Sequence, residues 1–167
     1  QFIPLPHLLI NKANLNIDSD KQNSTSIQTE NLKIFLNTNN LYPKSNLKFN
    51  KVEIENTNFK FKFNDIKNFR DHLYNKKNKE IIIKKSNFFY LDEDNETILI
   101  SPIKKLFYKI NKNDNSKKLK IIGNIFDVDY ESLWKAYEEK PKTSNIEIKF
   151  KNPNLTLKSL LEIDHSS

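Results

Sequence analysis

Cysteine and methionine are absent from this sequence, and glycine occurs only once, at Gly123. Without cysteine the chain has no disulfide, no thiolate nucleophile and no cysteine-ligated metal. A single glycine excludes the glycine-rich loops that bind the phosphate groups of nucleotides. The chain starts at Gln1, and because a complete natural protein rarely lacks methionine, we expect it to be part of a longer protein.

Long apolar runs are also missing, because no segment approaches the roughly 20 consecutive apolar residues that cross a bilayer as a helix. Arginine occurs only at Arg70, although lysine and arginine together number 28 against 21 acidic residues. Base and phosphate recognition favour arginine over lysine, so the net charge of +7 indicates a lysine-rich surface more than a nucleic-acid site. We therefore expect no nucleic-acid partner.

Residues suited to catalysis or metal binding are present but scattered. His7, His72 and His165 do not have the spacing of a metal site or a catalytic triad. The acidic cluster Asp92 to Asp94 is typical of an exposed hairpin turn, because no glycine at the turning position and no distal glutamate complete a calcium loop. The sequence therefore predicts a chain that is not an enzyme and that has no metal site and no cofactor.

One pattern occurs three times, and the predicted fold is organised around it. Its copies are LLINKANLNI from Leu8, VEIENTNFKF from Val52 and IIIKKSNFFY from Ile81. Each copy has isoleucine at its third position, then a small Ala, Thr or Ser followed by asparagine. We predict that each copy is one long strand, broken in the middle at the same place. Solenoid repeats keep a fixed period, which these copies do not.

Alternating apolar residues predict further strands. The polar stretch Asp18 to Thr29 is predicted as a loop, and Pro102 is predicted to interrupt a strand. From Leu47 to Phe63 the apolar parity switches twice, and the second switch, at Glu55 to Asn58, predicts a bulge and a sharp bend. Gly123 indicates a bend or a close backbone approach. The expected strands are Leu8–Ile17, Asn31–Asn37, Leu47–Phe63, Ile81–Leu91, Thr97–Ser101, Ile103–Ile110, Leu119–Val128, Ile146–Phe150 and Leu155–Leu157.

Two segments change to a helical period. Asn64 to Lys77 places Ile66, Phe69 and Leu73 at helical spacing, with lysines near its C-terminal end. The second helix is predicted over Tyr130 to Glu139, with Pro141 after it; its apolar side would carry Tyr130, Leu133, Trp134 and Tyr137. We expect the first helix to cover one side of the strand that begins at Ile81.

These elements predict a mainly β (α+β) fold with a single domain over residues 1–167. The expected architecture is a long, strongly bent antiparallel sheet that forms an open groove, with one or two short amphipathic helices. So few helices leave part of one sheet face uncovered, and exposed apolar area usually marks a binding surface. The many aromatic residues in the strands have two interpretations, an ordinary core and a groove of the size of a lipid.

Four stretches in this order resemble the N-terminal region of the AsmA-like family, of the TamB-related lipid-transport type, from about Pro4 to Leu160. They are PLPHLLINKANLNI, TENLKIFLNTNNLYPKSNLKFNKVEIENTNFKFKF, IIIKKSNFFYLDEDNETILISPIKKLFYKI and LKIIGNIFDVDYESL. The resemblance implies a membrane anchor upstream of this chain, followed by a long β structure curled into an apolar groove. The residues expected to line that groove are Phe59, Phe61, Phe63, Phe88, Tyr90 and Leu99.

The function implied by the resemblance is non-catalytic. The protein would be anchored in the inner membrane with this domain in the periplasm, and would act in lipid transport and outer-membrane biogenesis and homeostasis. Its ligand would be a phospholipid or another acyl lipid, and its partners would be other envelope proteins. The alternative function is a structural scaffold module that adds strands of the same protein or of a partner to its sheet edge. A basic nucleic-acid-binding domain is the third and least supported.

Overall fold

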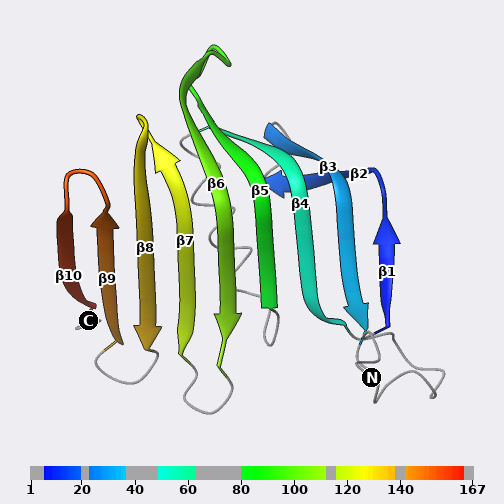
Figure 1. Ribbon diagram of the computed structural model, residues 1–167. Helices are drawn as coiled ribbons and strands as arrows, with labels where there is room; N and C mark the ends of the chain where they lie inside the picture. The colour runs from blue at the N-terminus through cyan, green and yellow to red at the C-terminus, as the bar shows by residue number, and fades with distance from the viewer. Residues whose placement is uncertain are drawn as a thin grey trace.

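A computed structural model gives the fold and describes residues 6–19, 23–36, 49–62, 80–111, 116–137 and 142–163. Ten strands form one sheet whose two ends are β1 and β10 (Figure 1). Along the sheet the order is β1-β3-β4-β5-β6-β7-β8-β9-β10, and β2 pairs with β3. The strands are β1 (His7–Ile10), β2 (Ala13–Ser19), β3 (Asn23–Leu36), β4 (Phe49–Lys62), β5 (Glu80–Leu91), β6 (Thr97–Ile110), β7 (Lys117–Ile125), β8 (Val128–Tyr137), β9 (Lys142–Phe150) and β10 (Leu155–Ile163).

The mainly β character of the chain is confirmed, and among the described strands the sheet does not close on itself. The sheet is mixed, however, so the expectation of a purely antiparallel sheet was wrong. β4 and β5 run parallel, from Lys51 opposite Glu80 to Lys62 opposite Leu91. A parallel pair cannot be joined by a tight hairpin, because the chain must first return to the starting end of the sheet. The helix predicted at Asn64 to Lys77 falls in this connection, outside the described residues.

All three copies of the repeated pattern are broken at the same position, as predicted. In the first copy the chain leaves β1 at Ile10 and resumes in β2 at Ala13. In the other two copies the break falls on Asn56 in β4 and Lys85 in β5, whose φ angles of 54° and 46° are left-handed. These two breaks lie side by side, because the register of β4 and β5 is the same before and after them. Figure 1 shows β2 running across the direction of β1 and the strands bending at this level.

Small polar side chains stabilise the sheet at the break. The hydroxyl of Thr57 donates a hydrogen bond to Thr29 Oγ1 at 2.7 Å, and the Thr57 amide donates to Ser86 Oγ at 3.1 Å. Ser86 in turn donates to the carbonyl of Lys84 at 2.8 Å. The side chains of Thr29, Thr57 and Ser86 are all buried. A small hydroxyl residue after the left-handed position therefore supplies hydrogen bonds where the ladder is interrupted.

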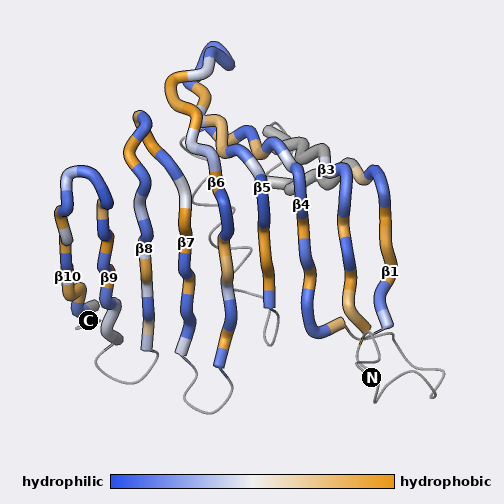
Figure 2. The backbone as a smooth tube through the Cα atoms, in the orientation of Figure 1, coloured by the Kyte–Doolittle hydropathy of each residue, from blue (hydrophilic) through white to orange (hydrophobic). Residues whose placement is uncertain are grey.

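Hydrophobic and hydrophilic residues are interleaved along the strands (Figure 2). Because successive side chains point to opposite faces, the two faces of the sheet have different chemistry. On one face, here called the apolar face, side chains that lie opposite one another form two long rows. The first row is Ile10, Leu32, Ile54, Ile83, Leu106, Ile121, Ser132, Ile148 and Leu157. The second is Ile34, Val52, Ile81, Tyr108, Leu119, Trp134 and Ile146. The buried core includes members of both rows, Ile83 and Tyr108 among them.

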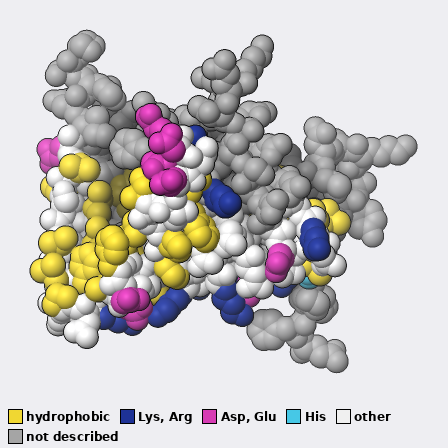
Figure 3. All heavy atoms as spheres, turned by 90° about the horizontal axis from the view of Figure 1, so that it is seen from above, with side chains coloured by type: hydrophobic (Ala, Val, Ile, Leu, Met, Phe, Trp, Pro, Cys, Tyr) yellow, Lys and Arg dark blue, Asp and Glu magenta, His cyan; other side chains and the backbone are white. Residues whose placement is uncertain are grey.

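The other face, here called the charged face, carries the intervening residues. One of its rows contains Lys33, Glu53, Ile82, Phe107, Lys120, Leu133, Glu147 and Lys158. In the view from above, several lysine and acidic side chains lie along one edge of the molecule (Figure 3). None of the described residues belongs to a helix with the length and apolarity of a membrane span.

The prediction of a helix over Tyr130 to Glu139 was wrong, because residues up to Tyr137 form β8. Its residues pair on one side with β7 and on the other with β9, so its backbone hydrogen bonds are made across the sheet. Tyr130 and Trp134 are an even number of residues apart, so their spacing suits a strand as well as a helix. Leu133 and Tyr137 lie on the opposite face. The rest of the predicted helix, Glu138 and Glu139, is outside the described residues.

Three predicted boundaries also need correction. Most of the expected loop from Asp18 to Thr29 is instead strand: β2 runs to Ser19 and β3 begins at Asn23, and these two residues lie opposite each other. Residues 20–22 are outside the described residues. Pro102 does not interrupt its strand: β6 is continuous, and its pairing with β7 begins only at Ile103, so Pro102 needs no amide proton there. β7 ends at Ile125. The turn to β8 consists of Phe126 and Asp127, which have φ angles of 48° and 62°.

The close backbone approach predicted at Gly123 is confirmed. A Cβ atom at this position would lie 2.7 Å from the carbonyl oxygen of Pro102 and 3.2 Å from Cδ1 of Ile103. Glycine therefore allows β6 and β7 to lie close together just beside the break in the sheet.

Candidate functional site

The apolar face becomes more exposed from β6 towards β10. In the middle of the sheet Ile83 is 1% exposed and Leu106 3%, whereas Leu157 on β10 is 50% exposed. The residues between them are half-buried. We call this part of the face the apolar strip and define it by Leu119, Ile121, Trp134, Ile146, Ile148 and Leu157.

The apolar strip follows from simple alternation in the strands that carry it. Leu119 and Ile121 on β7, like Ile146 and Ile148 on β9, are two residues apart and so point to the same side. Trp134, the only tryptophan of the chain, lies between Leu119 and Ile146. Directly opposed side chains in neighbouring strands are in contact range. The strip therefore extends across four strands, through Trp134 in one row and with Ser132 between Ile121 and Ile148 in the other.

Ion pairs lie on the charged face of β7 to β10, opposite the apolar strip. Lys120 Nζ lies 2.8 Å from Glu131 Oε1. Glu147 Oε1 lies 3.5 Å from Lys149 and 3.6 Å from Lys158. Exposed pairs of this kind add little stability. They do fix which face of β7 to β10 is turned to water, because burying these charges would be costly.

Two acidic groups of this face, Glu53 and Glu131, have a lowered pKa and remain ionised at neutral pH. Burial acts to raise the pKa of Glu53, but the hydrogen bond from Lys84 and the charges of Lys84 and Lys51 bring it below its ordinary value of 4.5. The hydrogen bond from Lys120 lowers the pKa of Glu131 against a smaller effect of burial. A carboxylate with a lowered pKa is a poor proton donor or acceptor near pH 7. These groups are suited to ion pairing rather than to acid–base catalysis.

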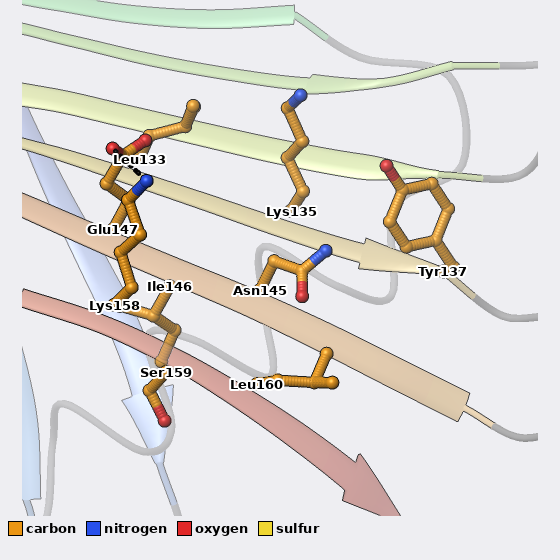
Figure 4. A pocket seen from close by; sticks show the side chains of 9 residues that line it. All are labelled: Leu133, Lys135, Tyr137, Asn145, Ile146, Glu147, Lys158, Ser159 and Leu160. Carbon is orange, nitrogen blue, oxygen red and sulfur yellow. Dashed lines mark ion pairs between the residues drawn. The ribbon is translucent and has the colours of Figure 1, made fainter.

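A shallow depression of about 430 Å³ lies over β8, β9 and β10 (Figure 4). Figure 4 shows Leu133, Lys135 and Tyr137 following one another along β8, with Glu147 and Asn145 beside them on β9. By the alternation of the strands these side chains belong to the charged face. The full lining is Leu133, Lys135, Tyr137, Asn145, Ile146, Glu147, Lys158, Ser159 and Leu160. Two of its charged groups, Glu147 and Lys158, already form an ion pair with each other.

The residues predicted to line a groove are not part of the apolar strip. Phe59, Phe61 and Phe88 lie in the buried core, with 1%, 3% and 7% exposure. Their rings pack together: Phe88 meets the other two edge-on, with centroids 5.2 and 5.4 Å away. Tyr90 and Leu99 lie opposite each other and are half-buried, and Phe63 is outside the described residues. Their contact with a ligand stays a prediction.

The strip residues on β8 and β9 were missed at the sequence level because Trp134 was assigned to a helix. The alternation of Ile146, Ile148 and Phe150 was visible, but it does not reveal which face stays exposed.

The pKa of the Tyr90 phenol is raised, first because the side chain is buried and second because Tyr130 lies nearby. The phenol therefore stays neutral at physiological pH.

Within the described ranges, no three histidine, aspartate or glutamate side chains lie together as a metal site would require. The sequence matches no protein-family model and no curated protein. The resemblance to the AsmA-like family stays a prediction from the four stretches that suggested it.

Proposed function

We propose that this chain is a non-catalytic lipid-binding module in which the apolar strip forms part of an open groove for acyl chains. The observation that carries the proposal is the asymmetry of β7 to β10. Their apolar face is half-buried to half-exposed, while their other face carries ion pairs. A surface of this kind usually binds an apolar partner.

The dimensions and energies suit an acyl chain. Neighbouring strands lie about 4.8 Å apart, so four strands offer an apolar path of roughly 14 Å from first to last. Each methylene group removed from water on this path contributes about 0.8 kcal/mol. Lysines near the strip, such as Lys117, add attraction for an anionic head group of about 1 kcal/mol each close to a lipid surface.

The cellular role in this proposal is lipid transport within the cell envelope and outer-membrane homeostasis. A membrane anchor outside this chain would hold it at the inner membrane with the sheet in the periplasm. The support for this role is the resemblance to the AsmA-like family, together with the apolar strip that such a role requires.

The fluorescence of Trp134 tests the proposal, because this single tryptophan lies in the middle of the strip. Phospholipid with a bromine-labelled acyl chain is titrated into the protein. We expect quenching that saturates and that unlabelled phospholipid reverses. The variant Ile148→Glu places a charge in the strip and should weaken binding about tenfold or more, since burying an unpaired carboxylate costs several kcal/mol.

The matched control is Lys149→Glu, which changes the adjacent residue on the charged face. It should bind the labelled lipid as the unaltered chain does. An absence of quenching, or equal binding by both variants, would remove the support for a lipid site on the strip.

The second candidate function, addition of further strands to the sheet, is favoured by a separate observation. β10 pairs with β9 and with no other strand that the structure describes. An edge strand in this state can accept another strand by backbone hydrogen bonding.

A further inference from the structure

β10 is a long and apolar sheet edge. It has nine residues, and every side chain from Leu155 to Glu162 is exposed. Its four leucines, Leu155, Leu157, Leu160 and Leu161, are 46%, 50%, 60% and 49% exposed. Edge strands of this kind are usually shortened or charged, because their unpaired amides and carbonyls attract other strands. The exposed leucines of β10 favour pairing.

We propose that two copies of this chain join through β10, which pairs with β10 of the second copy in antiparallel orientation around Leu160. In this register Leu160 lies opposite Leu160 of the partner subunit. Lys158 then lies opposite Glu162 of the partner subunit, and Glu162 opposite the partner's Lys158. The proposal gives the strand-addition function a specific partner, and it does not depend on the lipid-binding function.

Charge complementarity selects this register. Lys158 and Glu162 lie on the same face of β10, because they are an even number of residues apart. The side chain of Lys158 is 74% exposed, although it lies 3.6 Å from Glu147. A lysine on an edge normally opposes pairing. Two lysines would lie opposite each other if the strands paired in parallel and in register, or if they paired antiparallel around Lys158. Antiparallel pairing around Leu160 instead places each lysine opposite a glutamate.

The apolar faces of the two copies also match in this arrangement. Leu157, Ser159 and Leu161 alternate with the charged residues, so they share the face of the apolar strip. Antiparallel pairing around Leu160 places Leu161 opposite Ser159 of the partner subunit. A two-fold axis perpendicular to the sheet keeps both apolar faces on the same side. Leu157, Leu160 and Leu161 would then be flanked by strands on both sides.

A single-cysteine variant tests the register, because the chain has no other cysteine. Directly opposed residues of an antiparallel pair have Cα atoms about 4.5 to 5.5 Å apart, which is within the range for a disulfide. Leu160→Cys should therefore oxidise to a covalent dimer. Thr156→Cys, on the same face of the same strand, has no cysteine opposite it in this register and should form no covalent dimer. Equal cross-linking of the two variants would overturn the proposal.

Charge reversal gives an independent test by sedimentation equilibrium. Lys158→Glu or Glu162→Lys alone should weaken the dimer by about tenfold or more, because two attractive cross-strand pairs become repulsive. The double variant carrying both changes should recover the original Kd. Lys149→Glu is the control for the lost contact with Glu147, because Lys149 is as close to Glu147 but lies on β9.

The outcomes are separate from those of the lipid experiment. A chain that stays monomeric at all accessible concentrations would refute self-pairing, whatever the Trp134 titration shows. A dimer that is indifferent to both single reversals would mean that another surface joins the copies, which also overturns the proposal.

Discussion

Lys85 has a backbone conformation that glycine or asparagine adopts more easily. Its φ of 46° is left-handed, which costs an L-residue roughly 1 to 2 kcal/mol. The equivalent residue in β4 is Asn56, whose side chain tolerates this conformation better. The strain at Lys85 is therefore the clearer of the two, and it persists because the neighbouring strands bend at the same level.

Replacing Lys85 by glycine should relieve this strain. We expect Lys85→Gly to raise the free energy of unfolding by roughly 0.5 to 1 kcal/mol, the cost of the left-handed residue minus the entropy cost of glycine. The lost ion pair with Glu55 matters little, since the Lys85 side chain is 74% exposed. Urea unfolding measures the change. Lys84→Gly, one residue earlier in ordinary strand conformation, should destabilise the chain; a loss of stability in both would contradict the argument.

Glu53 should make the stability of the chain depend on acid pH. Its folded-state pKa lies below the ordinary 4.5, so the stability it contributes is present above that value and is lost as the pH falls through the folded pKa. Glu53→Gln should lower the free energy of unfolding at pH 7 by about 1 to 2 kcal/mol. The difference from the unaltered chain should shrink below about pH 4. A difference independent of pH in denaturant titrations would show that charge is not the cause.

Gly123 allows β6 and β7 to lie close together, so replacing this one residue should affect two strands. Gly123→Ala would place a methyl group 2.7 Å from the Pro102 carbonyl oxygen, which belongs to the backbone of β6 and cannot rotate away. We expect a loss of about 1 to 3 kcal/mol in the free energy of unfolding, as in other overpacked sites. Thermal unfolding followed by circular dichroism measures it. A wild-type melting temperature would show that β6 and β7 separate without cost.

At the scale of the strands, the sequence was most informative where a pattern repeats. The break before Thr57 and Ser86 was predicted because three separate segments carry a small residue, Ala, Thr or Ser, at the same place in the pattern. The direction of β5 was not predictable in this way, since alternation looks the same in parallel and antiparallel strands. β8 was missed because Tyr130 and Trp134 are spaced for a helix and for a strand alike. The start of β3, which pairs with β2, was not predicted because its residues are mostly polar.

Alternation was also insufficient to predict which residues form the candidate site. Alternation correctly grouped the phenylalanines of β4 and β5, but it could not tell the buried centre of a sheet from its exposed flank. Phe59 and Phe61 lie in the centre and are buried, while Ile148 and Leu157 lie on the flank. Exposure on this face depends on how far a strand lies from the middle of the sheet, and that distance is a property of the strand order.

At the scale of the molecule, a single sheet carries both proposed functions. The apolar strip and the β10 edge are adjacent, and Leu157 belongs to both. Lipid uptake and self-pairing can be measured separately, because one is read from Trp134 and the other from the mass of the complex. A dimer that binds no lipid would support self-pairing and exclude the lipid site. A monomer that binds lipid would support the lipid site and exclude self-pairing.

The breaks and turns at the strand ends limit the length of the strands but not the number of strands in the sheet. Beyond the level of Gly123, β7 continues for only two more residues, to Ile125, before the turn to β8. The apolar strip thus has a fixed height, set by the length of β7 to β10. Its width is not fixed, because each strand added beyond β10 extends it by about 4.8 Å. A longer ligand lying across the strands would therefore require more strands, and it would not require longer ones.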